Sequence, residues 1–527
     1  MKTSGTVSNS IKKYARVLPL TLVVPLFLAS CNQKTISGAP KEHNDLPNIV
    51  IFYVDDLGFG DLSSYGAQGV STPNVDHLAK DGIRFSDAHT TAATCTPSRY
   101  SLLTGEYAFR KKAQVLRGDA TLLIDPEGPT LPKMLKKAGY KTAVVGKWHL
   151  GLGAANVGAD WNGEVKPGPI EVGFDYSFLL PATGDRVPTV YLENHHVVNL
   201  DPSDPLSVSY IEKIGDRPTG TENPELLRQA ADPQHANTII NGISRIGWMA
   251  GGKSAEWVDE DFHQVFTQKA QQFISENKQN PFFLFFSFHD IHVPRLPAER
   301  FRGVSEMGLR GDAIVQMDWI TGEVINELKR LNLYDNTLII FSSDNGAILT
   351  DGYDDQAIER LGQHKPNGVY RGGKYSAYEA GTRVPMIVSW PEHIEPGVSD
   401  ALISQVDVYA SLANLLGIDL GRTEAIDSKN MLAALSKAKA EGRQVLLEQS
   451  YTLSLRDGVW KYIRPTEKEG DWIKDSKNIE SGLSPEAQLF KLDDDPGEQK
   501  NLAQQFPERV AAMEEKIVEI EQRTARP

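Results

Sequence analysis

The sequence predicts an α/β fold in which a large, mostly parallel sheet is flanked by helices and a smaller α+β subdomain follows. Apolar runs typical of buried parallel strands alternate with periodic helical stretches over most of the chain. Strands that alternate apolar and polar residues occur only near the C-terminus. Because 527 residues are more than one hydrophobic core normally serves, we expect a large domain over 47–420 and a subdomain over 421–527.

Four predicted strands form the centre of the sheet, and each ends at chemically reactive side chains. Helices predicted over 131–138 and from about 258 to 274 precede two of them. In sheets of this kind ligands bind beyond the carboxyl ends of the strands, so the four ends indicate one site. The strands are 48–54 before Asp55 and Asp56, 141–145 before Lys147 and His149, 281–286 before His289 and His292, and 337–341 before Asp344 and Asn345.

Two features predict the C-terminal subdomain: segments in which apolar and polar residues alternate, and a helix with one apolar face. Residues 459–463 and 488–492 alternate like strands of an antiparallel sheet, and 494–498 form a turn. A terminal helix presents one apolar face, formed by Val510, Met513, Ile517 and Ile520.

The first 31 residues resemble a bacterial lipoprotein signal. Basic residues precede an apolar stretch over 17–28, and the run ends in Leu28-Ala29-Ser30-Cys31. The stretch is too short to span a membrane. This interpretation predicts cleavage before Cys31, a lipid on its sulfur, a tether over 32–46, and an exported lipoprotein held at the periplasmic or cell surface of a membrane. The alternative is a disordered N-terminal tail.

Composition narrows the function. The formal net charge is −14 and no long basic run occurs, which argues against a nucleic-acid partner. The chain has only two cysteines, Cys31 and Cys95. If Cys31 carries a lipid, Cys95 has no partner for a disulfide, and a single thiol in an exported protein is explained by a chemical role.

The acidic residues at two strand ends suit a hard cation. Asp55, Asp56, Asp344 and Asn345 offer oxygen ligands and about three negative charges, which favour Ca²⁺ or Mg²⁺ over a metal that prefers thiolates. The alternative is that these side chains only cap the helices that follow.

Cys95 lies in the run Cys95-Thr96-Pro97-Ser98-Arg99. Pro97 favours a first helical turn, which places Cys95 at a helix N-terminus, where free N–H groups stabilise an anion. Arg99, in the same turn, can then hold the nucleophile. Lys147 and His149, two apart on an extended segment, are expected to point to the same side of the chain. The plain alternative for Cys95 is a buried cysteine in a helix-start turn.

Together these motifs resemble type I sulfatases, a family of alkaline-phosphatase-like fold, over residues 48 to about 416. The closest likeness is to bacterial carbohydrate sulfatases. The matching segments are Asp55–Asp61, Cys95–Arg99, Gly146–Gly151, His289–Pro294, Ser343–Gly346 and Arg371–Glu379. The resemblance implies a sulfuric ester hydrolase that acts through a formylglycine sulfoenzyme intermediate, with Ca²⁺ as the usual ion. A formylglycine-generating maturation enzyme would oxidise Cys95.

The resemblance also implies roles for single residues. Lys147 would bind the sulfate and the formylglycine, and His149 would deprotonate its second hydroxyl. His292 and Lys374 would serve the oxygen of the departing alcohol. His289 is either a partner of the site residues or a structural histidine.

A sulfated saccharide is the expected substrate, with a galactose or N-acetylgalactosamine sulfate as the candidate. The candidate residues for binding sugar hydroxyls are Thr183, Asp185, Arg186 and His364, which could equally be loop structure. One alternative function is a phosphonate or phosphodiester hydrolase of the same superfamily. Another is a glycan-binding lipoprotein without catalysis.

Overall fold

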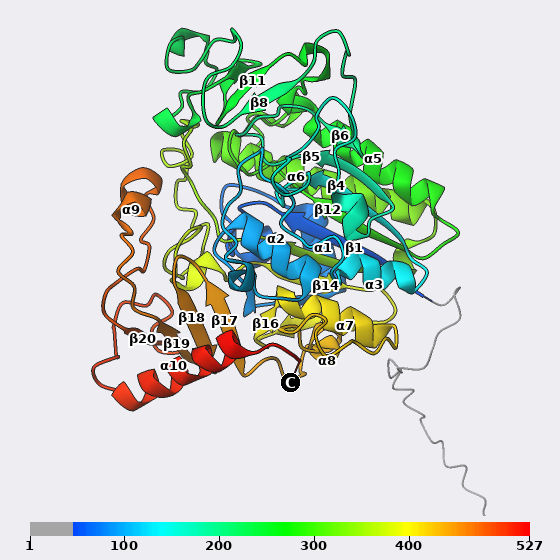
Figure 1. Ribbon diagram of the computed structural model, residues 1–527. Helices are drawn as coiled ribbons and strands as arrows, with labels where there is room; N and C mark the ends of the chain where they lie inside the picture. The colour runs from blue at the N-terminus through cyan, green and yellow to red at the C-terminus, as the bar shows by residue number, and fades with distance from the viewer. Residues whose placement is uncertain (1–45, 527) are drawn as a thin grey trace, which may run out of the picture. The chain divides into compact units, whose positions relative to one another are not determined.

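A computed structural model describes residues 46–526 and confirms the α/β fold (Figure 1). Its main element is a ten-stranded sheet of order β15-β2-β14-β13-β1-β12-β4-β5-β6-β7, in which the short strands β6 (Leu192–Glu193) and β7 (His196–Val197) form one edge. The predicted signal segment with Cys31 and nearly all of the tether lie outside the described residues, so those remain predictions. Among the described residues no helix is long and apolar enough to cross a bilayer.

Five neighbouring parallel strands form the centre of this sheet. Every residue of β1 is buried, which explains why the strand reads as a continuous apolar run. The strands, in order across the sheet, are β13 (Thr337–Ser343), β1 (Asn48–Val54), β12 (Phe282–Ser287), β4 (Lys141–Lys147) and β5 (Tyr176–Leu180). β14 (Met386–Ser389) pairs antiparallel with β13 and with β2 (Ile83–Phe85), which in turn pairs with the edge strand β15 (Gly397–Ser399).

Helices cover both faces of the sheet. On one face α1 (Pro73–Asp81), α5 (Phe262–Glu276) and α6 (Gly308–Arg330) share a hydrophobic core with alternate residues of β1, such as Phe52. The other face, which Tyr53 occupies, lies under α2 (Cys95–Thr104), as the guanidinium of Arg99 stands 5.4 Å from the Tyr53 ring centroid. α3 (Leu131–Lys137) and α7 (Val408–Leu415) lie beside α2 (Figure 1).

A second sheet confirms the predicted C-terminal α+β part. Its four antiparallel strands are β17 (Val445–Gln449), β18 (Leu453–Asp457), β19 (Trp460–Ile463) and β20 (Gln488–Lys491). The last two match predicted strands, whereas β17 and β18 were not predicted. α10 (Pro507–Gln522) buries Met513, Ile517 and Ile520 against this sheet, as its apolar face predicts, and Val510 is partly buried there.

Several predicted boundaries differ from the structure by a few residues; β13, for example, ends at Ser343 and not at 341. The helix predicted from 258 begins at Phe262, because residues 259–261 form a separate 3₁₀ turn. β4 continues two residues beyond the predicted end, to Lys147. The short strands β3 (Ala88–His89) and β16 (Ile403–Ser404) pair with each other, and the helix α9 (Asp471–Lys477) lies between β19 and β20 in the chain.

Candidate active site

Four adjacent strands deliver the predicted reactive side chains to one place. Because β13, β1, β12 and β4 are neighbours and parallel, their carboxyl ends lie at the same edge of the sheet. At Gly146 the chain passes so close to β12 that an added Cβ would stand 1.9 Å from the Ser287 carbonyl oxygen. Only glycine fits there, and the close approach brings Lys147 beside the end of β1.

Three buried carboxylates form the centre of the site. Asp55, Asp56 and Asp344 are each fully buried, and each offers an oxygen within 4.8 Å of the others. Asp56 adopts a left-handed backbone conformation, with a φ of 64°, which is uncommon for a residue other than glycine. The Asn345 side-chain amide donates to Asp56 Oδ1 over 2.7 Å. Burial and the nearby charge of Asp55 raise the pKa of Asp344 to about 7.

Each carboxylate binds one cation at hydrogen-bond distance, and Arg99 Nη2 also stands 3.9 Å from Asp55 Oδ1. Lys147 Nζ binds Asp55, Arg99 binds Asp344 at 2.7 and 2.9 Å, and Lys374 Nζ binds Asp56 Oδ2 at 2.9 Å. Burial alone would raise the pKa of Asp55, but the ammonium of Lys147 holds it well below its usual value.

Arg99 differs from the expectation that it holds the nucleophile directly. Nε and Nη2 of its guanidinium bind Asp344, while Nη1 donates to Ser287 Oγ and to the Lys147 carbonyl. Among the described residues no hydrogen bond joins Arg99 to Cys95. Arg99 therefore positions Asp344 in this arrangement.

The carboxylate cluster fits a hard divalent cation. Asp55 Oδ1 and Asn345 Oδ1 are buried without a hydrogen-bond partner. Buried polar atoms are normally paired, so two such oxygens beside Asp56 and Asp344 indicate a missing positive ligand. An all-oxygen donor set is typical of Ca²⁺ or Mg²⁺.

Cys95 is the first residue of α2, as Pro97 in its first turn predicts. Its Sγ lies 3.3 Å from His149 Nδ1. The other ring nitrogen of His149, Nε2, faces the Leu116 carbonyl oxygen at 2.9 Å and donates to it, which leaves Nδ1 as a lone-pair acceptor aimed at Cys95. Burial and the charge of Lys147 hold the pKa of His149 well below its usual value, so the ring is neutral.

The expected geometry of Lys147 and His149 is wrong in detail. β4 ends at Lys147, and His149 has a φ of 55°, so the two residues do not share an extended segment. They reach the same site by a turn of the backbone: Lys147 faces Asp55 and His149 faces Cys95.

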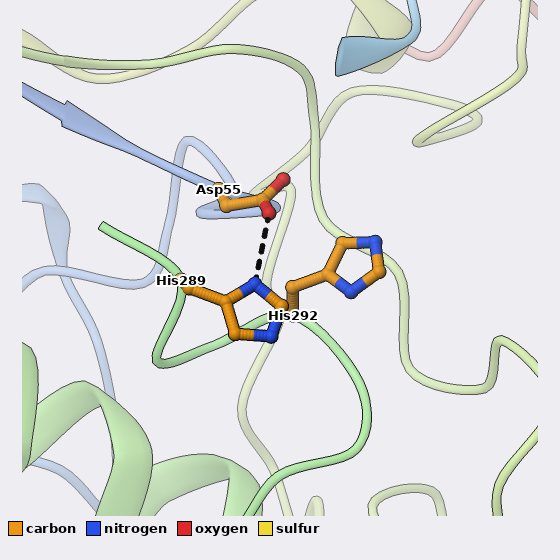
Figure 2. Close-up of side chains that lie close together, drawn as sticks. All are labelled: Asp55, His289 and His292. Carbon is orange, nitrogen blue, oxygen red and sulfur yellow. Dashed lines mark ion pairs between the residues drawn. The ribbon is translucent and has the colours of Figure 1, made fainter. Parts of the chain in front are cut away.

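Two histidines follow β12 and lie beside Asp55 (Figure 2). His289 Nδ1 stands 3.6 Å from Asp55 Oδ2, and its Nε2 accepts the Gly184 N–H at 3.0 Å. His289 was expected to be either a partner of the site residues or a structural histidine. This geometry favours a partner that orients Asp55. His292 Nδ1 donates to the Val293 carbonyl over 2.6 Å, so its free Nε2 faces Asp56 Oδ2 at 3.9 Å.

A cavity of about 380 Å³ opens onto these groups, with Cys95, His292 and Lys374 in its lining. Of the predicted sugar-binding residues, Asp185 and Arg186 also line it. Thr183 lies behind them, where it donates to Asp185 and accepts from Arg186 Nη1 at 2.8 Å.

His364 is not part of this cavity, so the structure does not support its predicted role in sugar binding. Its Nε2 binds Asp61 at 2.8 Å and its Nδ1 accepts the backbone N–H of Gln68 at 3.2 Å. Both ring nitrogens are thereby used, and the side chain is buried away from the lining residues.

Several site residues were missed from the sequence. Asp351 Oδ2 accepts from Lys374 at 3.1 Å, and His235 Nε2 lies 3.5 Å from Asp185. Lys477 and Trp472 line the cavity from α9, more than a hundred residues after Asp351. Only Asp351 carries a local signal, since it follows the Asp344 segment; the others are brought in by tertiary contacts.

Comparison with known proteins identifies related chains. A family model described as Sulfatase matches residues 47–418. An N-acetylgalactosamine-6-O-sulfatase of Bacteroides thetaiotaomicron is 49% identical over 518 residues, covering 97% of this chain and 100% of the relative. Human arylsulfatase H is 32% identical over 423 residues, which cover 74% of this chain and 73% of the relative.

Solved structures are similar as well. One from Bacteroides thetaiotaomicron, described under the metabolism of multiple glycosaminoglycans, superposes with a TM-score of 0.89 at 50% identity and covers 91% of this chain and 100% of its own. A phosphonate monoester hydrolase of Agrobacterium radiobacter shares the fold, with a TM-score of 0.55 at 17% identity over 90% of this chain and 95% of its own.

The carboxylate cluster predicts stabilisation by a hard cation. Adding Ca²⁺ to chelator-treated protein should raise the midpoint of thermal unfolding, by an increment worth about 2.7 kcal/mol at a hundredfold excess over Kd. Asp344→Asn should remove most of this increment, because it removes a charged ligand. Asp318→Asn, at a buried carboxylate that binds Asn74 and Val75 instead, should keep it. An equal response in both variants, or a response to Zn²⁺ alone, would contradict the assignment.

Proposed function

The chain belongs to the sulfatase family and is a sulfuric ester hydrolase, and we propose that it removes the 6-O-sulfate of an N-acetylgalactosamine or galactose unit in a sulfated glycan. The observation that supports this proposal most is the near full-length similarity to an N-acetylgalactosamine-6-O-sulfatase. This similarity extends over the C-terminal region, which contributes residues to the lining of the cavity. A cavity of about 380 Å³ suits one sulfated sugar unit. Of the two alternatives, the binding protein without catalysis is set aside by membership of an enzyme family, and the likeness to the phosphonate hydrolase concerns the fold alone.

We propose further that Cys95 acts as formylglycine. Burial raises the pKa of the Cys95 thiol, although Lys147 and Lys374 oppose this, so little thiolate forms at neutral pH. It is also the only free cysteine among the described residues. A thiol poorly suited to nucleophilic attack at the floor of the cavity supports conversion to another group. Hydrated formylglycine supplies two hydroxyls, one to attack the sulfur and one whose deprotonation releases sulfate.

His149 is the base that the geometry supports for that deprotonation. Its Nε2–H is held by the Leu116 carbonyl, and its unprotonated Nδ1 points at the Cys95 side chain. Because its pKa is lowered, the ring is free to accept a proton at neutral pH.

Lys374 and His292 serve the leaving oxygen in this proposal, since both line the cavity beside Cys95. Burial lowers the pKa of Lys374 in isolation, but Asp56 and Asp351 raise it well above its usual value, so the ammonium is charged. Burial lowers the pKa of His292 to about 4, against the opposing effect of Asp55. Lys374 therefore stabilises the developing alkoxide, and His292 assists once the anionic substrate favours its protonation.

Asp55, Asp56, Asp344 and Asn345 would hold the divalent cation, Ca²⁺ or Mg²⁺, which when bound withdraws charge from the sulfate oxygens. Lys147 binds Asp55 and fixes this carboxylate on one side of the site. Arg99 fixes Asp344 on the other.

Maturation predicts a modified Cys95. Mass spectrometry of the Cys95 peptide from the native host, or from a host that co-expresses a formylglycine-generating enzyme, should show an aldehyde that reacts with hydrazides. Cys95→Ala should abolish turnover and leave the unfolding midpoint within a few degrees, because the side chain serves chemistry. Full activity with an unmodified thiol would contradict the formylglycine proposal.

Substrate choice predicts a positional preference. The matured enzyme should release sulfate from N-acetylgalactosamine 6-sulfate at least about tenfold faster than from the 4-sulfate, since moving the ester along the ring displaces the sulfur from Cys95. Ion chromatography of released sulfate measures both rates. Faster release from the 4-sulfate, or from a phosphodiester, would reject the proposed substrate.

Export through the predicted lipobox would place the enzyme where it meets glycans. Cys31→Ser should move the protein from the membrane fraction to the soluble fraction without loss of sulfatase activity, since Cys31 lies outside the described active site. An unchanged membrane fraction would reject lipidation at Cys31.

A further inference from the structure

One wall of the cavity comes from the C-terminal part of the chain, beyond residues 47–418 that match the family model. The helix α9 contributes Trp472, whose side chain is 43% exposed, and Lys477. A large exposed aromatic side chain beside a polar catalytic floor indicates contact with a ligand.

Trp472 belongs to a group of three aromatic rings, here called the aromatic wall, formed by Tyr375, Tyr451 and Trp472. The ring of Trp472 stands 5.8 Å from that of Tyr375 and 5.7 Å from that of Tyr451, measured between centroids. All three residues line the cavity that contains Cys95. They come from three separate segments, so only the folded chain assembles the wall.

The aromatic wall is fixed relative to the reacting groups. Ile473 anchors α9 in the interior, and Lys477, only 4% exposed, binds Asp351 Oδ1 at 2.7 Å. The other oxygen of Asp351 accepts from Lys374 Nζ and from the Tyr375 hydroxyl, each at 3.1 Å. One carboxylate thus connects α9, the aromatic wall and the lysine that serves the leaving oxygen.

The cavity also has polar lining residues. Arg186, Asp185 and His235 form a connected group, with Arg186 Nη1 at 2.6 Å from Asp185 and His235 Nε2 at 3.5 Å from Asp185. The lining of this one cavity therefore offers both hydrogen-bonding groups and aromatic rings. A hexose matches such a lining, because its hydroxyls and its C–H groups lie on different faces.

We propose that Trp472, supported by Tyr375 and Tyr451, packs against the C–H face of the sugar ring that carries the sulfate ester, and that α9 thereby selects galacto-configured sugars. An axial O4 leaves the C–H groups at positions 3, 4 and 5 together on one face, which an electron-rich aromatic face attracts. This inference rests on the proposed function, since it assigns part of the sugar specificity of the same site.

The test compares Trp472→Ala and Trp472→Phe with the wild type in the matured, full-length enzyme. With N-acetylgalactosamine 6-sulfate, Trp472→Ala should raise KM about tenfold and change kcat less than about threefold, because the contact binds the ring and not the reacting sulfur. Trp472→Phe keeps an aromatic face and should stay within about threefold of the wild-type KM.

Two controls separate sugar packing from other effects. Phe506→Ala removes an aromatic side chain of equal exposure, 43%, that packs on Trp460 outside the cavity, and it should leave KM unchanged. Inhibition by inorganic sulfate should be the same in Trp472→Ala and wild type, because sulfate contacts the charged floor and lacks a sugar ring.

An unchanged KM in Trp472→Ala, or an equal weakening of sulfate inhibition, would overturn the inference. Failure of the wild type to act on both N-acetylgalactosamine 6-sulfate and galactose 6-sulfate is a separate result and rejects the proposed substrate. If the wild type acts on galactose 6-sulfate or glucosamine 6-sulfate, the same variants are compared on that substrate. A wild type that prefers glucosamine 6-sulfate to the galacto-configured sugars would also overturn the inference.

Discussion

The balance of buried charge at the ends of four parallel strands is the constraint on which this site depends. Asp55, Asp56 and Asp344 are fully buried, and an isolated carboxylate in such a place costs several kcal/mol. Lys147, Lys374 and Arg99 each hydrogen-bond one of them, so the six groups are close to neutral as a set. Loss of any one partner leaves an unpaired buried charge, which is more damaging than the pair is stabilising.

This balance also explains how the site attracts an anion. Three carboxylates against three cations leave no surplus of positive charge. The two oxygens without a hydrogen-bond partner, Asp55 Oδ1 and Asn345 Oδ1, can accept a further cation. A divalent cation on these oxygens would give the floor of the cavity a net positive charge. A sulfate ester, with one negative charge, is then drawn to a protein whose overall charge is −14, because local charges govern a narrow pocket.

The sequence predicts this floor well because its residues follow strands directly. Apolar runs locate β1, β12 and β13, and pairing of these strands in a parallel sheet then brings Asp55, His292 and Asp344 together. This result does not depend on the conformation of the connecting loops. Prediction from the sequence fails where the position of a side chain depends on an unusual backbone turn or on contacts with residues distant in the chain. His149 reaches Cys95 through a left-handed turn that alternation does not anticipate, and His364 is drawn away by Asp61. Trp472 and Lys477 carry no local signal, since α9 reaches the cavity only through tertiary contacts.

A second buried charge cluster joins the C-terminal sheet to Glu379, in the segment before β14, and to the short strand β3. Lys461 of β19 is fully buried and binds Glu379 Oε2 at 3.0 Å, and Arg456 of β18 binds the other oxygen of Glu379. On β17, Glu448 binds His89 of β3 at 2.8 Å. Polar contacts between domains usually permit movement, but these groups are buried and mutually dependent, so separating the C-terminal sheet from β3 and Glu379 would leave unpaired buried charges. The cluster therefore fixes the C-terminal sheet against the part of the chain that carries Cys95. The helix α9, which contributes Trp472 and Lys477 to the cavity, follows β19 of that sheet in the chain.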